Sequence, residues 1–207
     1  YGSMRALFQD ELKKRLAFST VSQVSYIVLG IALVSPMAAM GGLVHLVHQG
    51  LMKITLFFCA GNYAETLGTH RVSEMNGVGR RMPLTTAAFS VASLGMIGVP
   101  FLAGSVSKEY LQLGAEQAEA RWAILVLSAS SVLNAAYFLP ILWRAWARPP
   151  DARWPAEHTY GRWETHWMLL LPPLVTAVAV FWAGWWAGSS FSPLAWVKLI
   201  VQREFGP

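Results

Sequence analysis

An apolar run from residue 37 to residue 64 is long enough to cross a bilayer as one helix, yet it contains His45, His48 and Lys53. A charged lysine at the centre of a membrane helix costs roughly 2.5–3.5 kcal/mol on the scale derived from insertion experiments. Ionisable residues in such helices therefore face a protein interior or water, and they mark pathways for ions or substrates. Any fold of this chain has to accommodate Lys53.

The composition is that of a membrane-embedded chain. Hydrophobic residues make up 55% of the 207 positions and charged residues only 13%, whereas about a quarter of the residues in a soluble domain are charged. The net charge is +5, and basic clusters at residues 13–15, 80–81 and 144–148 flank the apolar runs, where they anchor helices to lipid headgroups. The charge therefore predicts contact with a lipid bilayer and not with nucleic acid.

Apolar runs at residues 16–34, 37–64, 83–99, 122–146 and 167–187 predict an all-α, polytopic transmembrane helix bundle. Tryptophans at the ends of the last two runs are typical of the aromatic belts at membrane interfaces. Residues 65–83 are polar and contain Gly and Pro, so they predict a loop. The amphipathic tail, residues 193–204, predicts an interfacial helix.

We therefore expect residues 1–207 to form a single membrane domain. Residues 1–118 carry the motifs discussed below, and residues 119–207 add two further spans and the interfacial tail. The chain opens without Met and without an apolar signal region, and we interpret it as a piece of a longer protein.

The basic clusters predict only part of the topology. Clusters 13–15 and 80–81 share one side of the membrane if the first two runs both cross it. Cluster 144–148 joins them only if an even number of crossings separates it from residue 82, which requires that residues 104–118 do not cross as well. The absolute topology stays open.

Gly95, Gly98, Pro100 and Gly104 fall within ten residues at the end of the third run. Proline removes an amide donor and glycine loosens a helix, so this composition predicts a broken helix near residues 98–108. Transporters line hydrated cavities with such breaks, and Lys108 would then stabilise or exchange an ion there. In the alternative interpretation, Lys108 begins a loop and extends to the headgroups.

His45, Gln49 and Lys53 are spaced i, i+4, i+8, so they share one helix face and span roughly 12 Å along it. His48 lies on a neighbouring line of the same helix. Groups that accept and release protons, with water between them, form a proton relay, and desolvation favours the neutral lysine that a relay needs. Interhelical hydrogen bonding is the alternative role of the two histidines.

The sequence contains no recognisable cofactor site and no catalytic site of its own. No glycine-rich nucleotide loop follows a strand and Cys59 is the single cysteine, so we expect no NADH, flavin, quinone or iron–sulfur cluster in this chain. A metal site at His45 and His48 is disfavoured because no carboxylate or cysteine lies in register. Haem ligation by these two histidines stays open and would give a visible absorption band.

Four segments resemble one protein family, in the same order and at similar spacing. They read ALFQDELKKRLAFSTVSQVSYIVLG, HLVHQGLMKITLFFCAG, MNGVGRRMPLTTAAF and GMIGVPFLAGSVSKEYL. They are similar to segments of the antiporter-like subunits shared by respiratory complex I and multisubunit Na+/H+ antiporters. The resemblance covers about residues 5–115, and it looks closest to the D-type subunit of those antiporters.

The resemblance implies a protein of fourteen core transmembrane helices with two inverted five-helix repeats, of which this chain would be the C-terminal half with the second repeat. It places Lys108 on the lysine of the second broken helix, the terminal proton site. It places Lys53 on the central-axis lysine, His45 on the upstream histidine of that helix and Lys13 on the lysine of the opening motif. Because Lys13 lies near the membrane edge, a headgroup anchor is its alternative role.

The chain departs from the family pattern at two places that bear on this site. Gln49 stands where many relatives have histidine, with His48 one place earlier, so the relay is rerouted or weaker there. Phe101 replaces the second proline of the break, which softens it.

We therefore expect a proton-translocating subunit, with Na+/H+ exchange as a second option, that works with other membrane subunits of a larger complex in the bacterial inner (plasma) membrane. Respiratory dehydrogenase, hydrogenase and stand-alone antiporter all fit as the parent complex. The predicted relay residues are Lys13, His45, Lys53 and Lys108, with His48 and Gln49 in supporting positions. The alternative is a non-conducting structural subunit, in which both buried lysines would be enclosed in ion pairs.

Overall fold

The computed structural model describes residues 1–150, 154–160 and 163–206. Apart from two isolated β-bridges, the regular elements of this described part are helices. They are α1 (Gly2–Leu7), α2 (Leu12–Ala32), α3 (Pro36–Leu67), the 3-10 helix η1 (Val72–Glu74), α4 (Val78–Arg81), α5 (Pro83–Ile97), α6 (Ala103–Gln117), α7 (Arg121–Ala147), α8 (Trp167–Trp185) and α9 (Pro193–Phe205). The predicted all-α fold is confirmed, and each apolar run corresponds to a helix.

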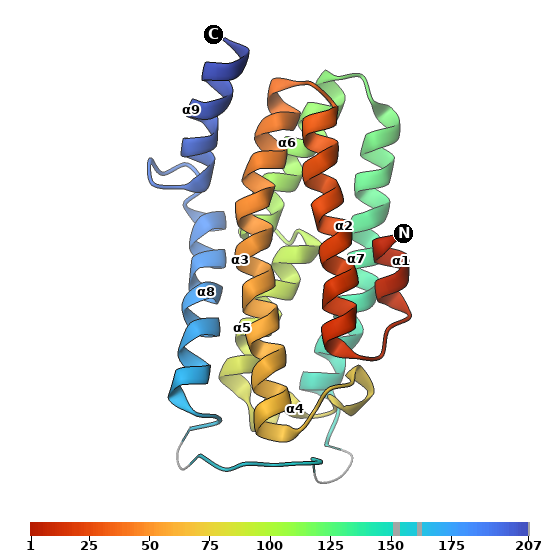
Figure 1. The fold of residues 1–207 in the computed structure, drawn as a ribbon, viewed down its shortest axis with the longest axis vertical. Coiled ribbons are helices and arrows are strands. Elements are labelled where there is room, and N and C mark those ends of the chain that lie inside the picture. Colours follow the sequence, from red (N-terminus) through yellow and green to blue (C-terminus); the bar gives the residue numbers. More distant parts are fainter. Residues whose placement is uncertain (151–153, 161–162, 207) are drawn as a thin grey trace.

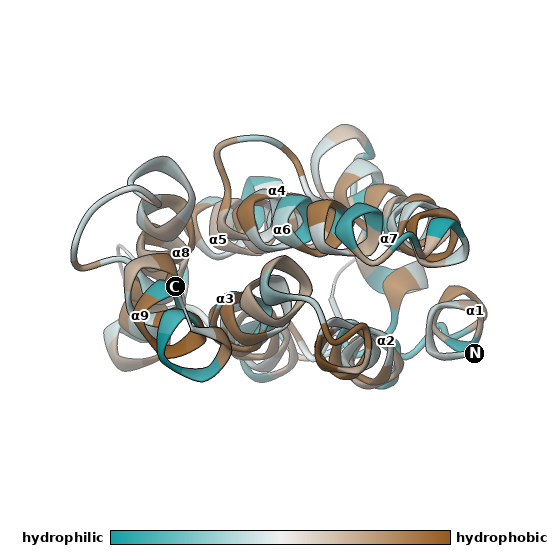
Figure 2. Ribbon diagram, turned by 90° about the horizontal axis from the view of Figure 1, so that it is seen from above, coloured by the Kyte–Doolittle hydropathy of each residue, from teal (hydrophilic) through white to brown (hydrophobic). Residues whose placement is uncertain are grey.

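The long helices lie along one axis and form a bundle (Figure 1). By length and hydropathy, α2, α3, α7 and α8 can each cross a membrane. Seen from above, α1, α2 and α3 form one layer and α5, α6 and α7 the other, with α8 and α9 at one edge (Figure 2). Large apolar side chains remain exposed on this bundle, among them Val28, Leu125 and Val178, as expected of helices that face lipid.

Helix α3 is the central element, and it contacts α2, α5, α6, α8 and α9. Its start is well defined, because the Ser35 hydroxyl accepts from Ala38 N and Pro36 occupies the first turn. Gly68 ends it in the left-handed conformation that glycine adopts at little cost. The helix that carries the histidines and Lys53 is therefore surrounded by protein along much of its length.

The connector at residues 65–83 is more ordered than the predicted loop, and that prediction is wrong in detail. The end of α3, the 3-10 helix η1 and α4 all fall within it. Backbone hydrogen bonds tie it to the start of α2, from Leu12 N to His70 O and from Val72 N to Asp10 O. Polar composition did not reveal these short helices because their stability depends on neighbouring chain segments.

The predicted broken helix is present between α5 and α6. Helix α5 ends at Ile97, Gly98 follows with a φ of 100°, and α6 begins at Ala103. The two helices run in the same direction one above the other (Figure 1). Together they therefore make one passage through the bundle.

A second interruption separates α8 from α9, as the separate runs 167–187 and 193–204 indicated, but the sequence did not predict that α9 continues the course of α8. The two helices follow each other end to end with a loop at residues 186–192 (Figure 1). Helix α9 packs beside α3, where Leu194, Val197 and Val201 form a cluster with Ala39 and Val44. An interfacial position for this segment stays a prediction.

The single passage made by α5 and α6 resolves the sidedness of the basic clusters. Residues 104–118 complete the crossing that α5 begins, so the number of passages between residues 82 and 144 is even. Gly77 N donates to Arg144 O (3.0 Å) and Leu12 N to His70 O (2.9 Å), which brings the start of α2, the connector and the end of α7 together. All three basic clusters thus lie at one end of the bundle.

Candidate functional site

Lys53 lies in the interior of the bundle. Its side chain is buried between α3 and α2, where Nζ donates to Ser19 Oγ (2.6 Å) and to Leu16 O (3.2 Å). The ammonium also lies 6.0 Å from the centroid of the Phe138 ring, at the outer limit of cation–π attraction. Lys53 is therefore held by neutral oxygen atoms and an aromatic ring.

Lys108 lies in α6, and its side chain turns back to the broken end of α5 instead of extending toward the headgroups. Its Nζ donates to Met96 O (2.8 Å), Ile97 O (2.9 Å) and Ser131 Oγ (3.1 Å). The last carbonyls of a helix have no partner within the helix and carry its partial negative charge. The Lys108 ammonium gives these carbonyls a hydrogen-bond donor and balances their partial negative charge. The lysine and the helix break therefore stabilise each other.

The glycines of the break make this geometry possible. A Cβ atom at Gly98 would lie 3.1 Å from Cδ of Lys108, and a Cβ at Gly104 would lie 1.8 Å from Gly95 O. Gly104 is therefore required for the close approach of α6 to α5. Pro100 lies in the exposed loop between them, where its ring does not interrupt either helix.

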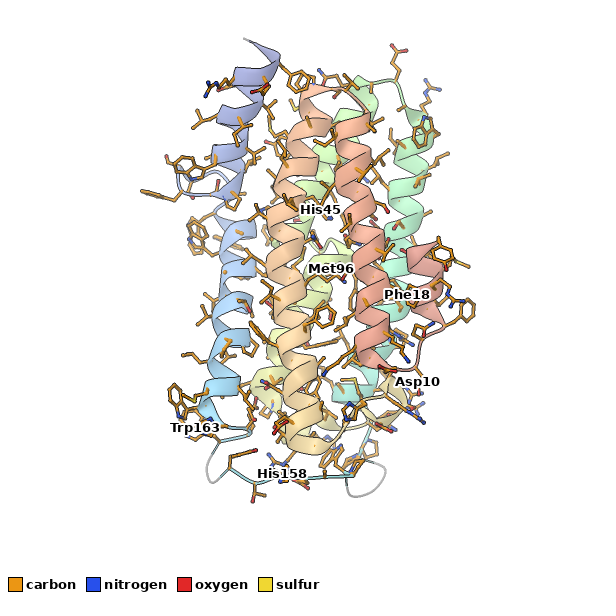
Figure 3. All side chains as sticks on the ribbon, in the orientation of Figure 1. Asp10, Phe18, His45, Met96, His158 and Trp163 are labelled. Atoms are coloured by element: carbon orange, nitrogen blue, oxygen red, sulfur yellow. The ribbon has the colours of Figure 1, made fainter. Side chains whose placement is uncertain are left out.

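His45 connects three helices at mid-height of the bundle, close to the level of Met96 (Figure 3). Its Nδ1 is 2.8 Å from Ser107 Oγ on α6, its Nε2 is 3.0 Å from Gln23 Oε1 on α2, and its ring stacks on Tyr26 at 5.3 Å. Because an amide oxygen only accepts, Nε2 carries a proton in this arrangement. His45 thus makes the interhelical hydrogen bonds that were the alternative to a relay role, and its role in a relay stays a prediction.

His48 and Gln49 are also buried in α3, but they are less well satisfied. The ring nitrogens of His48 and Oε1 of Gln49 have no hydrogen bond of good geometry within the described residues, and the same holds for Gln23 Nε2 and Ser93 Oγ. Buried polar atoms of this kind are usually bonded to internal water. These atoms mark where water would enter the interior.

Lys13 is separated from this interior. Its side chain is exposed near the start of α2, whereas Arg15 of the same basic cluster is buried. Arg15 donates to the backbone carbonyls of Gln9 (2.8 Å) and Tyr137 (3.1 Å). The structure thus joins Lys53, Lys108 and His45 into one buried region and leaves Lys13 at its edge.

Neutral side chains that the sequence did not single out make many of the contacts in this region. Ser19 and Ser131 accept from Lys53 and Lys108. The others bond to His45, to Met96 O or to Ser19, and they are Ser107, Asn134 and Tyr137. One signal was available, because Asn134 is the single amide in the apolar run 122–146, and polar side chains in such runs are costly unless bonded.

Neither Lys53 nor Lys108 forms an ion pair within the residues that the structure describes. The ion pairs found there join Lys14 to Glu11 (2.7 Å) and Arg81 to Glu157 (2.6 Å), and they lie at the end of the bundle with the basic clusters. In this part of the chain, no carboxylate therefore fixes the charge of the two buried amines.

The fold and these buried lysines define a polytopic membrane protein. Residues 1–134 match the family described as "NADH:quinone oxidoreductase/Mrp antiporter, TM", and the chain belongs to this family. The predicted resemblance to antiporter-like subunits is thus confirmed, while the finer likeness to the D-type subunit stays a prediction.

Two relatives illustrate the range of the family. NADH-quinone oxidoreductase subunit N of Desulforudis audaxviator is 40% identical over 187 residues, which is 87% of this chain and 37% of that protein. A probable K(+)/H(+) antiporter subunit of Rhizobium meliloti is 39% identical over 108 residues, which is 52% of this chain and 11% of the relative. The chain therefore spans less than half the length of these relatives.

Solved structures show the same fold. The Mrp complex from Dietzia sp. contains a chain that matches 100% of this one and 45% of its own length, with a TM-score of 0.85 and 23% identity. Respiratory complex I from Thermus thermophilus contains a chain that matches 98% of this one and 42% of its own length, with a TM-score of 0.80 and 24% identity.

Proposed function

We propose that this chain is the C-terminal half of an antiporter-like subunit, which moves protons across a membrane through Lys53 and Lys108. The observation that carries the proposal is the burial of both amines without a carboxylate partner in the described residues. An unpaired charge in such surroundings is costly. Two lysines that can gain and lose a proton there suit translocation.

The surrounding polar atoms support a hydrated path. His48, Gln23 and Ser93 each present a buried atom without a hydrogen bond of good geometry in the described residues. Water bonded to these atoms would connect the region around His45 with both lysines. In this proposal Lys13, which is exposed, exchanges protons with the solution at the basic end of the bundle.

The partners and the membrane belong to the same proposal. The relatives are named as subunits of quinone oxidoreductases and antiporters, so we propose other membrane subunits as partners and the bacterial inner membrane as the location. The three basic clusters at one end support a cytoplasmic orientation of that end. The transported ion is H+, with Na+/H+ exchange as the second option, which added Na+ would distinguish in a vesicle assay.

A non-conducting structural subunit is the competing function. It predicted ion pairs around the buried lysines, and the described residues contain none at Lys53 or Lys108. Hydrogen bonds to backbone carbonyls and hydroxyls leave both amines free to titrate, which favours the conducting function.

The test is Lys108→Ala and, separately, Lys53→Ala in the full-length protein assembled in its own complex. Proton uptake into inverted vesicles should fall by about 100-fold or more, the usual cost of losing a proton-transfer group. Lys14→Ala is the matched control, because Lys14 is an exposed lysine paired with Glu11, and it should transport normally. Unchanged uptake in an assembled Lys108→Ala complex would refute the proposal.

A further inference from the structure

A chain of direct hydrogen bonds leads away from Lys53 toward α7 and does not include His45. Lys53 Nζ donates to Ser19 Oγ at 2.6 Å, and Ser19 Oγ lies 2.9 Å from the hydroxyl of Tyr137. Tyr137 Oη is also hydrogen-bonded to Oδ1 of Asn134, one turn earlier on the same helix. The first lysine is thus joined to α7 by two hydroxyl groups.

From α7 the chain continues to the second lysine. Asn134 Nδ2 donates to Met96 O at 3.2 Å, and Met96 O is the same carbonyl that accepts from Lys108 Nζ at 2.8 Å. This carbonyl lies at the broken end of α5. The two lysines are therefore linked through α7, and each link is a hydrogen bond between protein groups.

The middle of this chain is closed to the outside. Ser19, Tyr137 and Asn134 are each 0% exposed, so neither bulk water nor lipid competes for their hydrogen bonds. Buried groups of this kind find hydrogen-bond partners chiefly among one another, and a polar group left without a partner costs free energy. A change of partner at one end of this hydrogen-bond chain therefore changes the hydrogen bond of the next residue.

Tyr137 has one hydroxyl proton and two oxygen neighbours. It donates either to Asn134 Oδ1, which only accepts, or to Ser19 Oγ, which both donates and accepts. A protonated Lys53 offers no lone pair, so it donates to Ser19. A neutral Lys53 offers a lone pair, so the Ser19 hydroxyl donates to it. Ser19 Oγ then accepts a hydrogen bond from the Tyr137 hydroxyl.

We propose that Tyr137 and Asn134 are positioning residues that couple the protonation of Lys53 to that of Lys108 by reversing the direction of this hydrogen-bond chain. When Lys53 loses its proton, Tyr137 turns to Ser19 and leaves Asn134 Oδ1 without its donor. The Asn134 amide also holds Met96 O, so the change reaches the carbonyl that stabilises the Lys108 ammonium. This inference rests on the proton-translocation function proposed above.

Other charged and titratable groups surround the chain without joining it. Arg15 and Tyr26 face Tyr137 from α2, and the Tyr26 ring also lies 5.6 Å from Lys108 Nζ. On α3, His45 lies in the field of both lysines and of His48. Arg15 bonds to the backbone carbonyl of Tyr137 and not to its hydroxyl. These groups shape the background field and are left in place in the test.

The test is Tyr137→Phe in the full-length protein within its own complex, with proton uptake measured as a function of pH. This variant removes only the hydroxyl and keeps the ring that packs on Phe138 at 4.8 Å. Loss of the hydroxyl breaks its hydrogen bonds to Ser19 and Asn134, which predicts a fall in uptake of about tenfold or more. The pH dependence should shift as well, because the two lysines would titrate independently.

Tyr63→Phe is the matched control. Tyr63 is equally buried, and its hydroxyl bonds to Thr86 Oγ1 at 3.1 Å, outside the chain. It should keep the wild-type pH dependence. Ser19→Ala breaks the same chain with little loss of volume and should repeat the shift if Tyr137→Phe does not assemble.

Three results would overturn the coupling. A wild-type rate and pH dependence in Tyr137→Phe, with Lys108→Ala still inactive, would remove the coupling and leave proton translocation intact. Equal losses in Tyr137→Phe and Tyr63→Phe without a shift would show a packing effect only. Normal transport in Lys108→Ala would refute the proposed function itself, and the coupling with it.

Discussion

The two interrupted passages of this bundle, α5–α6 and α8–α9, have similar architecture and different chemistry. In each, a helix ends midway, a short loop follows and a second helix continues in the same direction (Figure 1). Each second helix carries a lysine as its sixth residue, Lys108 in α6 and Lys198 in α9. Lys108 is 8% exposed, whereas Lys198 is exposed and lies 6.0 Å from the Tyr110 ring.

The interruptions also satisfy their backbone groups differently. At the second one, the Ser192 hydroxyl donates to Ala187 O (2.6 Å) and accepts from Ala195 N (3.2 Å), so a neighbouring side chain closes the loop. At the first one, Ile97 O accepts from Lys108 of the next helix, and Met96 O accepts from Lys108 and from Asn134 of α7. A broken helix becomes a candidate ion site when a titratable group, and not a local cap, satisfies its free carbonyls.

The largest difference between the two interruptions is expected when their lysines are removed in turn. Lys108→Ala should abolish proton uptake in the full-length complex, whereas Lys198→Ala should leave uptake within about twofold of wild type, as for most surface substitutions. Paired vesicle assays at equal protein content measure both. A strong loss in Lys198→Ala would show that the second interruption also carries protons.

A smaller effect is expected from changing the glycines next to the two interruptions. Gly104→Ala places a Cβ against Gly95 O, and the helices have to separate, which we expect to cost about 1–3 kcal/mol or more. Gly188→Ala meets open space and should be close to neutral. Thermal unfolding of the detergent-solubilised complex measures the difference. Equal midpoints for the two variants would contradict the tight approach of α6 to α5.

The smallest expected effect is at the local cap of the second interruption. Ser192→Ala removes the side chain that caps α9 and should cost about 1 kcal/mol, with proton uptake unchanged. A modest fall in the unfolding temperature together with normal uptake would support a purely structural role. Loss of proton uptake at unchanged stability would show that Ser192 takes part in transport and is not only a local cap.

Much of the fold could be predicted from the sequence, because hydropathy alone identifies spans of this length. The run around Lys53 became α3, and Gly98 and Pro100 marked the first interruption correctly. The packing of α9 was not predicted, because the segment is amphipathic and the sequence does not show whether its apolar face meets lipid headgroups or α3.

For the candidate site, the sequence identified the charged members and not the groups that hold them. Lys53 and Lys108 stand out because charge is rare in apolar runs. Ser19 and Tyr137 do not stand out, since hydroxyls in membrane helices commonly bond to their own backbone. Ser19 and Tyr137 bond to each other although they lie more than one hundred residues apart along the chain. No local sequence pattern spans such a separation.

A helical membrane protein with two costly buried lysines and one helix break could be recognised from the amino-acid sequence alone. The cost of placing charge and free backbone groups in hydrocarbon acts on each segment separately. The tertiary packing was needed to show that Lys53 and Lys108 are both buried, which carbonyls they meet and that all three basic clusters lie at one end of the bundle. These features depend on how α2, α3, α5, α6 and α7 pack around one another, and packing brings together residues that are distant in the sequence.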